Sequence, residues 1–212
     1  MKVTHQKYED QNILQHCSSE DPFTLDRYRQ FHRFFQEGVQ NILDVGCNTG
    51  RGGTILNEID NGLRISGLDC VQERLEQLPD AYTEGVYGLS TEIPKDDGTY
   101  DVIVAGEFLE HLYPADVDKS LCEFQRVLKV GGRLLMTTPN PYYVKYKLDR
   151  ALTVYTVSHL TQHYPDVLKW RLKMHGFSRV KLYGSGRMSR YIGYHFPWLS
   201  VYGSYLVSAD KY

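Results

Sequence analysis

The chain has 212 residues, of which 42% are hydrophobic and 24% charged, a composition typical of an ordinary globular domain. A formal net charge of −2 offers no basic surplus and argues against a nucleic-acid partner. The polar start lacks the apolar core of a signal peptide, and no apolar run is long enough to cross a membrane, so we expect one cytoplasmic domain without membrane insertion.

The four cysteines are scattered along the chain, at positions 17, 47, 70 and 122. None of them forms a pair with metal-ligand spacing, so free thiols in a reducing compartment are expected.

Residues 1–38 are predicted to form a helical preface to the domain. Helix-like spacing of three and four residues places Leu25, Tyr28, Phe31, Phe34 and Phe35 on one apolar stripe, and Asp21-Pro22 is a suitable helix start. Such a preface covers one end of a sheet. Alternatively, it forms a lid over a ligand, with Tyr28 or Arg29 reaching it.

The stretch from Asn41 to Gly53, NILDVGCNTGRGG, predicts a buried strand, a glycine-rich turn and a helix. This order lets backbone N–H groups approach a ligand closely at a helix N-terminus. The spacing is Gly-x-x-x-Gly, which differs from the dinucleotide pattern Gly-x-Gly-x-x-Gly, and no Gly-Lys-Ser/Thr follows to wrap a triphosphate. The turn therefore indicates a nucleoside-type ligand.

Strands and helices alternate in the next hundred residues, which predicts an α/β fold with a parallel sheet covered on both faces. Strands are expected over 63–69, 81–88, 100–106 and 133–138, and helices over 54–59, 71–78 and 116–128, the last one closed by a left-handed cap at Gly131-Gly132.

The end of the chain departs from this alternation. A helix is predicted over 158–175, followed by strands over 177–183 and 202–209. The loop between these two strands is too short for a crossover helix, so the strands are expected to pair antiparallel.

The carboxyl ends of parallel strands form the ligand-binding edge of such a sheet. Asp44, Asp69, Ser90-Thr91 and Gly106-Glu107 are predicted to lie there with the glycine turn. Asp69 follows Asp44 by 25 positions and is placed like an acid that accepts hydrogen bonds from ribose hydroxyls. Alternatively, Asp69 caps the helix that follows it.

Four motifs, LDVGCNTGRGG, GLDC, YDVIVAGEFLEHL and LKVGGRLLMTTPNP, occur in the order and spacing of a known family. Over residues 41–140 the chain resembles the class I S-adenosylmethionine-dependent methyltransferases. The resemblance implies a Rossmann-like, doubly wound, seven-stranded sheet with its last strand antiparallel, with residues 141–212 adding the acceptor side of a single domain over 1–212.

The resemblance also implies S-adenosylmethionine as the cofactor. Its amino acid part would face Gly46–Gly50, its ribose Asp69, and its methionine portion Gly106-Glu107. The segment Gly88-Leu89-Ser90 lacks the aspartate with which many relatives bind adenine, so backbone atoms or Ser90 and Thr91 would substitute for it. The expected cofactor-binding residues are Asp44, Gly46, Cys47, Asn48, Gly50, Asp69, Cys70, Ser90, Thr91, Gly106 and Glu107.

The whole-chain pattern, including DPFTLDRYRQF and SHLTQHYP, is similar to methyltransferases associated with O-antigen and surface-polysaccharide biosynthesis. This similarity implies O-methylation of a small-molecule or glycan acceptor. N- or C-methylation of another metabolite, or a non-catalytic binding or scaffold protein, are the alternatives. The sequence leaves the oligomeric state open.

Candidate catalytic residues are His159, His163 and Glu107, while His111 is expected to form structural hydrogen bonds. His159 and His163 stand four positions apart, which suits one helix face and would also suit a metal. No H-E-x-x-H glutamate accompanies them, so no metal is expected. Tyr142, Tyr143 and Tyr146 are predicted to shape the acceptor pocket, and Arg187 and Arg190 either bind an anionic group or are solvated loop charges.

Overall fold

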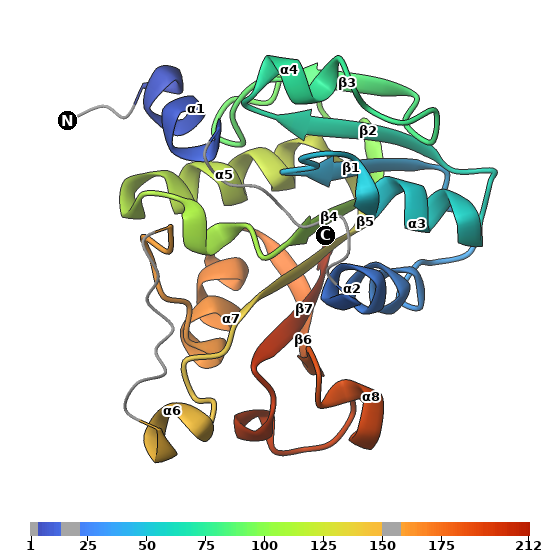
Figure 1. The fold of residues 1–212 in the computed structure, drawn as a ribbon. Helices are drawn as coiled ribbons and strands as arrows, with labels where there is room; N and C mark the ends of the chain where they lie inside the picture. The colour runs from blue at the N-terminus through green and yellow to red at the C-terminus, as the bar shows by residue number, and fades with distance from the viewer. Residues whose placement is uncertain (1–3, 14–21, 150–157) are drawn as a thin grey trace.

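The computed structural model describes residues 4–13, 22–149 and 158–212, and its centre is one seven-stranded sheet in the order β3-β2-β1-β4-β5-β7-β6 (Figure 1). The strands are β1 (Asn41–Val45), β2 (Arg64–Asp69), β3 (Glu84–Tyr87), β4 (Tyr100–Gly106), β5 (Leu128–Pro139), β6 (Phe177–Ser185) and β7 (Ser204–Lys211). Strands β1 to β5 pair in parallel, and β7 lies antiparallel between β5 and β6. The predicted fold class is therefore confirmed.

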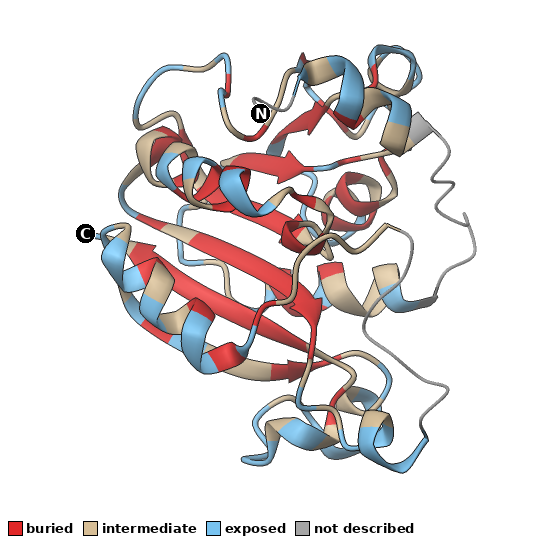
Figure 2. Ribbon diagram, turned by 90° about the vertical axis from the view of Figure 1, so that its left-hand side faces the viewer, coloured by how far each residue is buried: buried red, intermediate tan, exposed pale blue. Residues whose placement is uncertain are grey.

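Helices cover both faces of this sheet. They are α1 (His5–Ile13), α2 (Pro22–His32), α3 (Arg51–Ile59), α4 (Gln72–Leu75), α5 (Pro114–Val127), α6 (Lys145–Leu148), α7 (Pro165–Met174) and α8 (Ser189–Ile192), with short 3₁₀ turns η1 (Leu109–His111) and η2 (Leu199–Val201). One apolar core joins the sheet to α5 and α7, and a second joins the sheet to α2 and α3. Figure 2 shows the buried residues running along the strands, with exposed residues on the outer sides of the helices. Among the described residues, no helix combines the length and hydropathy that crossing a membrane requires.

The predicted helix over 158–175 is too long. Helix α7 begins at Pro165, and Tyr164 before it has the extended backbone angles φ −74° and ψ 135°. The ring of a proline clashes with a helical conformation at the preceding residue, which explains why the helix cannot start earlier. His159 and His163 consequently do not share a helix face.

The predicted glycine cap of the 116–128 helix is also wrong. Helix α5 begins at Pro114 and ends at Val127, and Leu128 is already extended at φ −69° and ψ 143°. Gly131 has a positive φ of 78°, yet it lies within β5, where it turns the chain rather than ending a helix. Helix α2 starts at Pro22, inside the predicted preface, while Asp21 and Cys17 lie outside the described residues.

Asp44 is a fully buried carboxylate that joins several elements beneath the glycine-rich turn. Side chains alternate along β1, so Asp44 faces α2 and α3 together with Ile42. Tyr28 of α2 donates a hydrogen bond to Oδ1 at 2.6 Å, and Tyr82 donates one to Oδ2 at 2.5 Å. The Tyr82 hydroxyl in turn accepts from the backbone N–H of Gly53 in α3 at 2.8 Å. Burial raises the pKa of Asp44 to about 6 against the opposing effect of the tyrosine hydrogen bonds.

The raised pKa of Asp44 predicts a specific pH dependence of stability. A folded-state pKa of about 6 stands above the value of about 3.9 in the unfolded chain, so the folded state binds the proton more tightly. The contribution of Asp44 to stability is therefore fully present below about pH 4, and roughly 3 kcal/mol of it is lost as the pH rises through 6. In Asp44→Asn the side chain at position 44 does not titrate in this range, so the free energy of unfolding should not show this fall. Urea denaturation of both proteins between pH 4 and pH 7 measures the difference in unfolding free energy, and a difference that does not change with pH contradicts the prediction.

Candidate active site

A cavity opens at the carboxyl ends of β1, β2 and β4, where the strand order reverses between β1 and β4. Its floor comes from Val45 and Leu68. Its walls come from the glycine-rich turn, the loop after β2, the loop after β3, the segment after β4, and helix α1. This is the place where an open α/β sheet binds its ligand, as the sequence predicted.

The glycine-rich turn brings backbone close to this cavity. Gly46, Asn48 and Gly50 adopt positive φ values of 69°, 51° and 79°. A Cβ atom at Gly46 would come within 2.8 Å of the Phe108 ring, so the turn and the segment after β4 can only pack this closely around a glycine. The N–H groups of Gly46 and Cys47 donate to the carbonyl of Leu68 at 2.8 and 3.2 Å, which fixes the turn against β2.

Asp69 at the end of β2 is only 6% exposed and already holds two backbone groups. Its Oδ2 accepts from the Asn48 N–H at 2.9 Å, and its Oδ1 accepts from the Val71 N–H at 3.0 Å. Each carboxylate oxygen has two lone pairs, so both oxygens retain capacity for ligand hydroxyls. The alternative that Asp69 caps the next helix is wrong, because the N-cap of α4 is Val71 and no side chain caps it. Asp69 instead orders the loop before α4 and lines the cavity.

Most of the predicted cofactor-binding residues meet in this cavity. Those lining it are Gly46, Asn48, Asp69, Cys70, Ser90, Thr91, Gly106 and Glu107. Within the described chain, Asp44, Cys47 and Gly50 lie elsewhere, with Asp44 bound to its two tyrosines and Cys47 buried. The hydroxyl of Ser90 stands 2.7 Å from that of Ser120 in α5, and Leu89 beside it lines the cavity with an apolar side chain.

Helix α1 lies within the predicted helical preface over 1–38 and covers the cavity, which is the position that the lid alternative gives to the preface. Tyr8 and Asn12 line the cavity from this helix. Tyr8 donates to Asp116 Oδ2 and accepts from the Tyr113 N–H, both at 3.0 Å, which ties α1 to the start of α5. The helix sequence HQKYEDQNI has too few apolar residues to show a stripe, so the sequence did not single out the tyrosine that is buried here. Tyr28, one of the two residues that the lid alternative named, donates its hydrogen bond to Asp44 instead.

A second cavity adjoins the first at Glu107. Phe23 and Arg27 of α2, Tyr143, Tyr146, His159 and Arg187 line it, together with Glu107 itself. The predicted pocket residue Tyr142 instead bonds Asp166 at 3.1 Å, and Arg190 forms an ion pair with Asp26. The second cavity is therefore aromatic and polar, with two guanidinium groups in its wall.

Glu107 stands at the junction of the two cavities in an unusual backbone conformation. Its φ of 52° is costly for a residue with a side chain, and such strain concentrates at functional sites. Its N–H donates to the carbonyl of Thr137 in β5 at 3.0 Å, which holds the conformation. Oε2 accepts from Ser204 at 3.4 Å, while Oε1 is buried without a hydrogen-bond partner among the described residues.

The predicted histidines separate into different environments. His159 lines the second cavity, and its ring lies 5.1 Å from that of His111, which lines the first. His163 lines neither cavity of the described chain; it is buried, stands 2.9 Å from Thr161 Oγ1, and has its pKa lowered to about 4 by burial. Burial also lowers the pKa of His111, whereas it raises that of neighbouring Glu110 well above its ordinary value, with Glu107 adding to the effect.

Part of the chain is similar to a known protein family. Residues 43–136 match the model of a methyltransferase domain. Over these residues, which make up less than half of the chain, the protein is similar to that methyltransferase domain.

Individual relatives agree with this domain assignment. A probable S-adenosylmethionine-dependent methyltransferase of Mycolicibacterium smegmatis is 30% identical over 103 residues, covering 48% of this chain and 38% of that protein. A fatty-acid O-methyltransferase of the same organism is 30% identical over 127 residues, covering 58% of this chain and 46% of its own. The chain thus spans less than half the length of these curated relatives.

The fold of the methyltransferase domain also has solved counterparts. The crystal structure of a SAM-dependent methyltransferase from Archaeoglobus fulgidus aligns with a TM-score of 0.64 at 21% identity, covering 88% of this chain and 92% of that one. An identity this low supports the fold alone.

Asp69 provides a test of the cofactor cavity in the methyltransferase domain. Asp69→Asn keeps the size of the side chain but removes the negative charge and one acceptor, so we expect S-adenosylmethionine to bind about tenfold more weakly or worse. Isothermal titration calorimetry measures the affinity, with the exposed Asp80→Asn as the matched control. Because Asp69 also holds two backbone groups, the thermal unfolding of each variant is recorded as well. If a folded Asp69→Asn protein binds S-adenosylmethionine with unchanged affinity, Asp69 does not contribute to cofactor binding.

Proposed function

We propose that the protein transfers a methyl group from S-adenosylmethionine to an oxygen atom of a small-molecule or glycan acceptor. The observation that carries this proposal is the pair of cavities meeting at Glu107. One has the glycine-rich turn and acid of a nucleoside site, and the other has the aromatic and polar lining of an acceptor site. Methyl transfer requires two ligands held end to end, which is what adjoining cavities provide.

In the proposed cofactor site, Asp69 accepts hydrogen bonds from the ribose hydroxyls, and the turn at Gly46 and Asn48 faces the amino acid part. Leu89 contributes apolar contact to adenine, and backbone groups of the loop after β3 take the place of the missing aspartate, since the Ser90 hydroxyl is engaged with Ser120. When bound, this cofactor supplies an electrophilic methyl group.

In the proposed acceptor site, Tyr143 and Tyr146 offer ring faces on which a sugar can stack. Arg27 and Arg187 are suited to bind a phosphate or carboxylate of the acceptor. Glu107 and His159 are the proposed groups that orient the acceptor hydroxyl and take its proton. His163 lies outside both cavities and is a weaker candidate for this role.

The similarity to a fatty-acid O-methyltransferase supports oxygen as the methylated atom. The aromatic and cationic lining favours a glycan or another anionic small molecule, in keeping with a place in cytoplasmic surface-polysaccharide biosynthesis. N- or C-methylation of another metabolite is the alternative within enzymes. A non-catalytic SAM-binding protein is the alternative outside them.

An assay for S-adenosylhomocysteine release tests the function. We expect turnover with hydroxylated acceptors among sugars, sugar nucleotides and hydroxy acids. Arg187→Gln should raise KM for a phosphorylated acceptor about tenfold while changing kcat little, because the lost contact is made equally in the ground and transition states. Lys181→Gln, an exposed change on β6, is the control. Turnover only with amines would show that nitrogen, and not oxygen, is the methylated atom. Cofactor binding without turnover on any acceptor would favour the non-catalytic alternative.

A further inference from the structure

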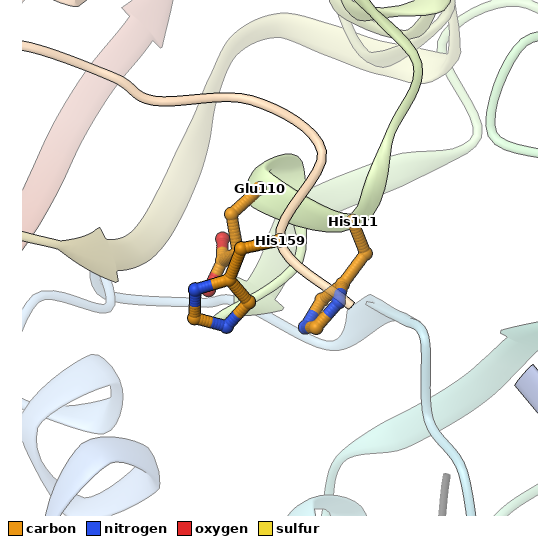
Figure 3. Close-up of side chains that lie close together, drawn as sticks. All are labelled: Glu110, His111 and His159. Carbon is orange, nitrogen blue, oxygen red and sulfur yellow. The ribbon is translucent and has the colours of Figure 1, made fainter. Parts of the chain in front are cut away.

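Glu110, His111 and His159 are three metal-ligating side chains that lie close together, as Figure 3 shows. One ligand atom from each side chain lies within 4.8 Å of the other two. Glu110 and His111 belong to η1, directly after β4 and Glu107, whereas His159 comes from the segment that leads to α7. Residues almost fifty positions apart in the sequence therefore meet at one point.

Backbone hydrogen bonds hold His159 in this position. The N–H groups of Leu160 and Thr161 both donate to the carbonyl of Glu110, at 2.7 and 3.1 Å. The Thr161 hydroxyl adds a bond to the carbonyl of Leu109 at 3.0 Å. None of these bonds uses the side chains of the cluster, so the three groups are placed together independently of any bond among them.

His111 is oriented as a metal ligand by its other ring nitrogen. Its Nδ1 stands 3.0 Å from the carbonyl oxygen of Ser158. A carbonyl oxygen only accepts, so Nδ1 carries the hydrogen and Nε2 of the neutral ring presents its lone pair. Metal-bound histidines are typically fixed in this way by a carbonyl or carboxylate behind them.

Glu110 has a carboxylate oxygen that the protein leaves unsatisfied. The residue is 1% exposed, and Oε2 accepts from the Thr138 hydroxyl at 3.1 Å. Its Oε1 is buried without a hydrogen-bond partner among the described residues, as is Oε1 of Glu107. A buried, unpaired carboxylate oxygen is costly, and a cation between these side chains would compensate both.

We propose that Glu110, His111 and His159 bind a divalent metal ion, with Glu107 beside it as a further oxygen donor. Two imidazoles with carboxylate suit Mn²⁺, Co²⁺ or Zn²⁺ better than Mg²⁺ or Ca²⁺, which prefer oxygen ligands alone. With bonds of about 2.1 Å the ligand atoms need to draw closer than in this structure, which requires the side chains to rotate on metal binding. This differs from the sequence expectation of no metal, because the cluster uses His159 with η1 rather than with His163.

The place of the ion suggests its role, which rests on the proposed O-methyl transfer. His111 lines the cofactor cavity, and His159 and Glu107 line the acceptor cavity, so the ion would stand at their junction. With His159 and Glu107 engaged as ligands, they would orient the acceptor through the ion, and an acceptor hydroxyl bound to the ion would lose its proton to water in place of proton removal by His159 or Glu107. The oxygen would then form its bond to the methyl carbon as the carbon–sulfur bond of the cofactor breaks.

Mn²⁺ titration followed by electron paramagnetic resonance tests the site directly, because the signal of free Mn²⁺ falls as the ion binds. The full chain is first stripped with a chelator, and no cofactor or acceptor is added. We expect saturable binding that Zn²⁺ displaces. Glu110→Gln and His159→Asn should each weaken it about tenfold or more. His163→Gln, four positions from His159 but outside the cluster, should bind as the wild type does.

Three outcomes decide the proposal. Absence of saturable binding to the wild type overturns it, and so does equal binding by the wild type and a folded His159→Asn protein, the variant less prone to unfolding because His159 is partly exposed. Loss of metal binding in His163→Gln would overturn the proposed ligand set and move the site to the pair His159 and His163, whose spacing the sequence analysis noted.

Calorimetric titration of S-adenosylmethionine runs in parallel. If the protein binds the metal but not S-adenosylmethionine, the metal site stands and the proposed function fails. If it binds S-adenosylmethionine but not the metal, the metal site fails and the proposed function stands.

Discussion

The buried carboxylate of Asp44 is the interaction on which the cofactor side of the domain depends. It belongs to the second-last residue of β1, just before the glycine-rich turn, and is held by Tyr28 from α2 and Tyr82 from the loop before β3. Tyr82 extends the contact to the backbone of α3 at Gly53. A charge withdrawn from water so completely is stabilised only while its partners stay in place, so the carboxylate fixes the positions of these segments relative to one another. The geometry of the turn above it follows from this constraint.

The two cavities arise from the same sheet edge but are built by different means. The first is formed by local turns that follow β1, β2 and β4, with α1 laid over them. The second depends on distant segments, because α2, the segment around His159 and the loop after β6 meet only through the fold. Glu107 connects them, and its left-handed backbone is maintained by bonds to β5. The cluster of Glu110, His111 and His159 lies at this connection, where a bound ion would contact both ligands.

The differences from the sequence predictions have identifiable physical causes. Pro165 prevents a helix from including Tyr164, so the spacing of His159 and His163 carried no information about their mutual position. Helix α1 falls within the predicted helical preface, but its sequence has no apolar stripe to show where it docks; one buried tyrosine and its bonds to Asp116 and Tyr113 hold it in place. Asp44 has the residue type of a ligand-binding acid, but strand alternation turns it towards α2, away from the cavity.

The sequence by itself determined the order of strands and helices, the reversed strand at the end, the glycine-rich turn and the acid at the end of β2. These features are local, because hydrophobic periodicity and glycine spacing act over a few residues and a parallel sheet brings strand ends to one edge. Only the tertiary structure decided which side chains face the cavities, which tyrosines satisfy Asp44, and that His159 joins Glu110 and His111. Those outcomes depend on packing between segments far apart in the chain, and no local pattern encodes the distance between such segments.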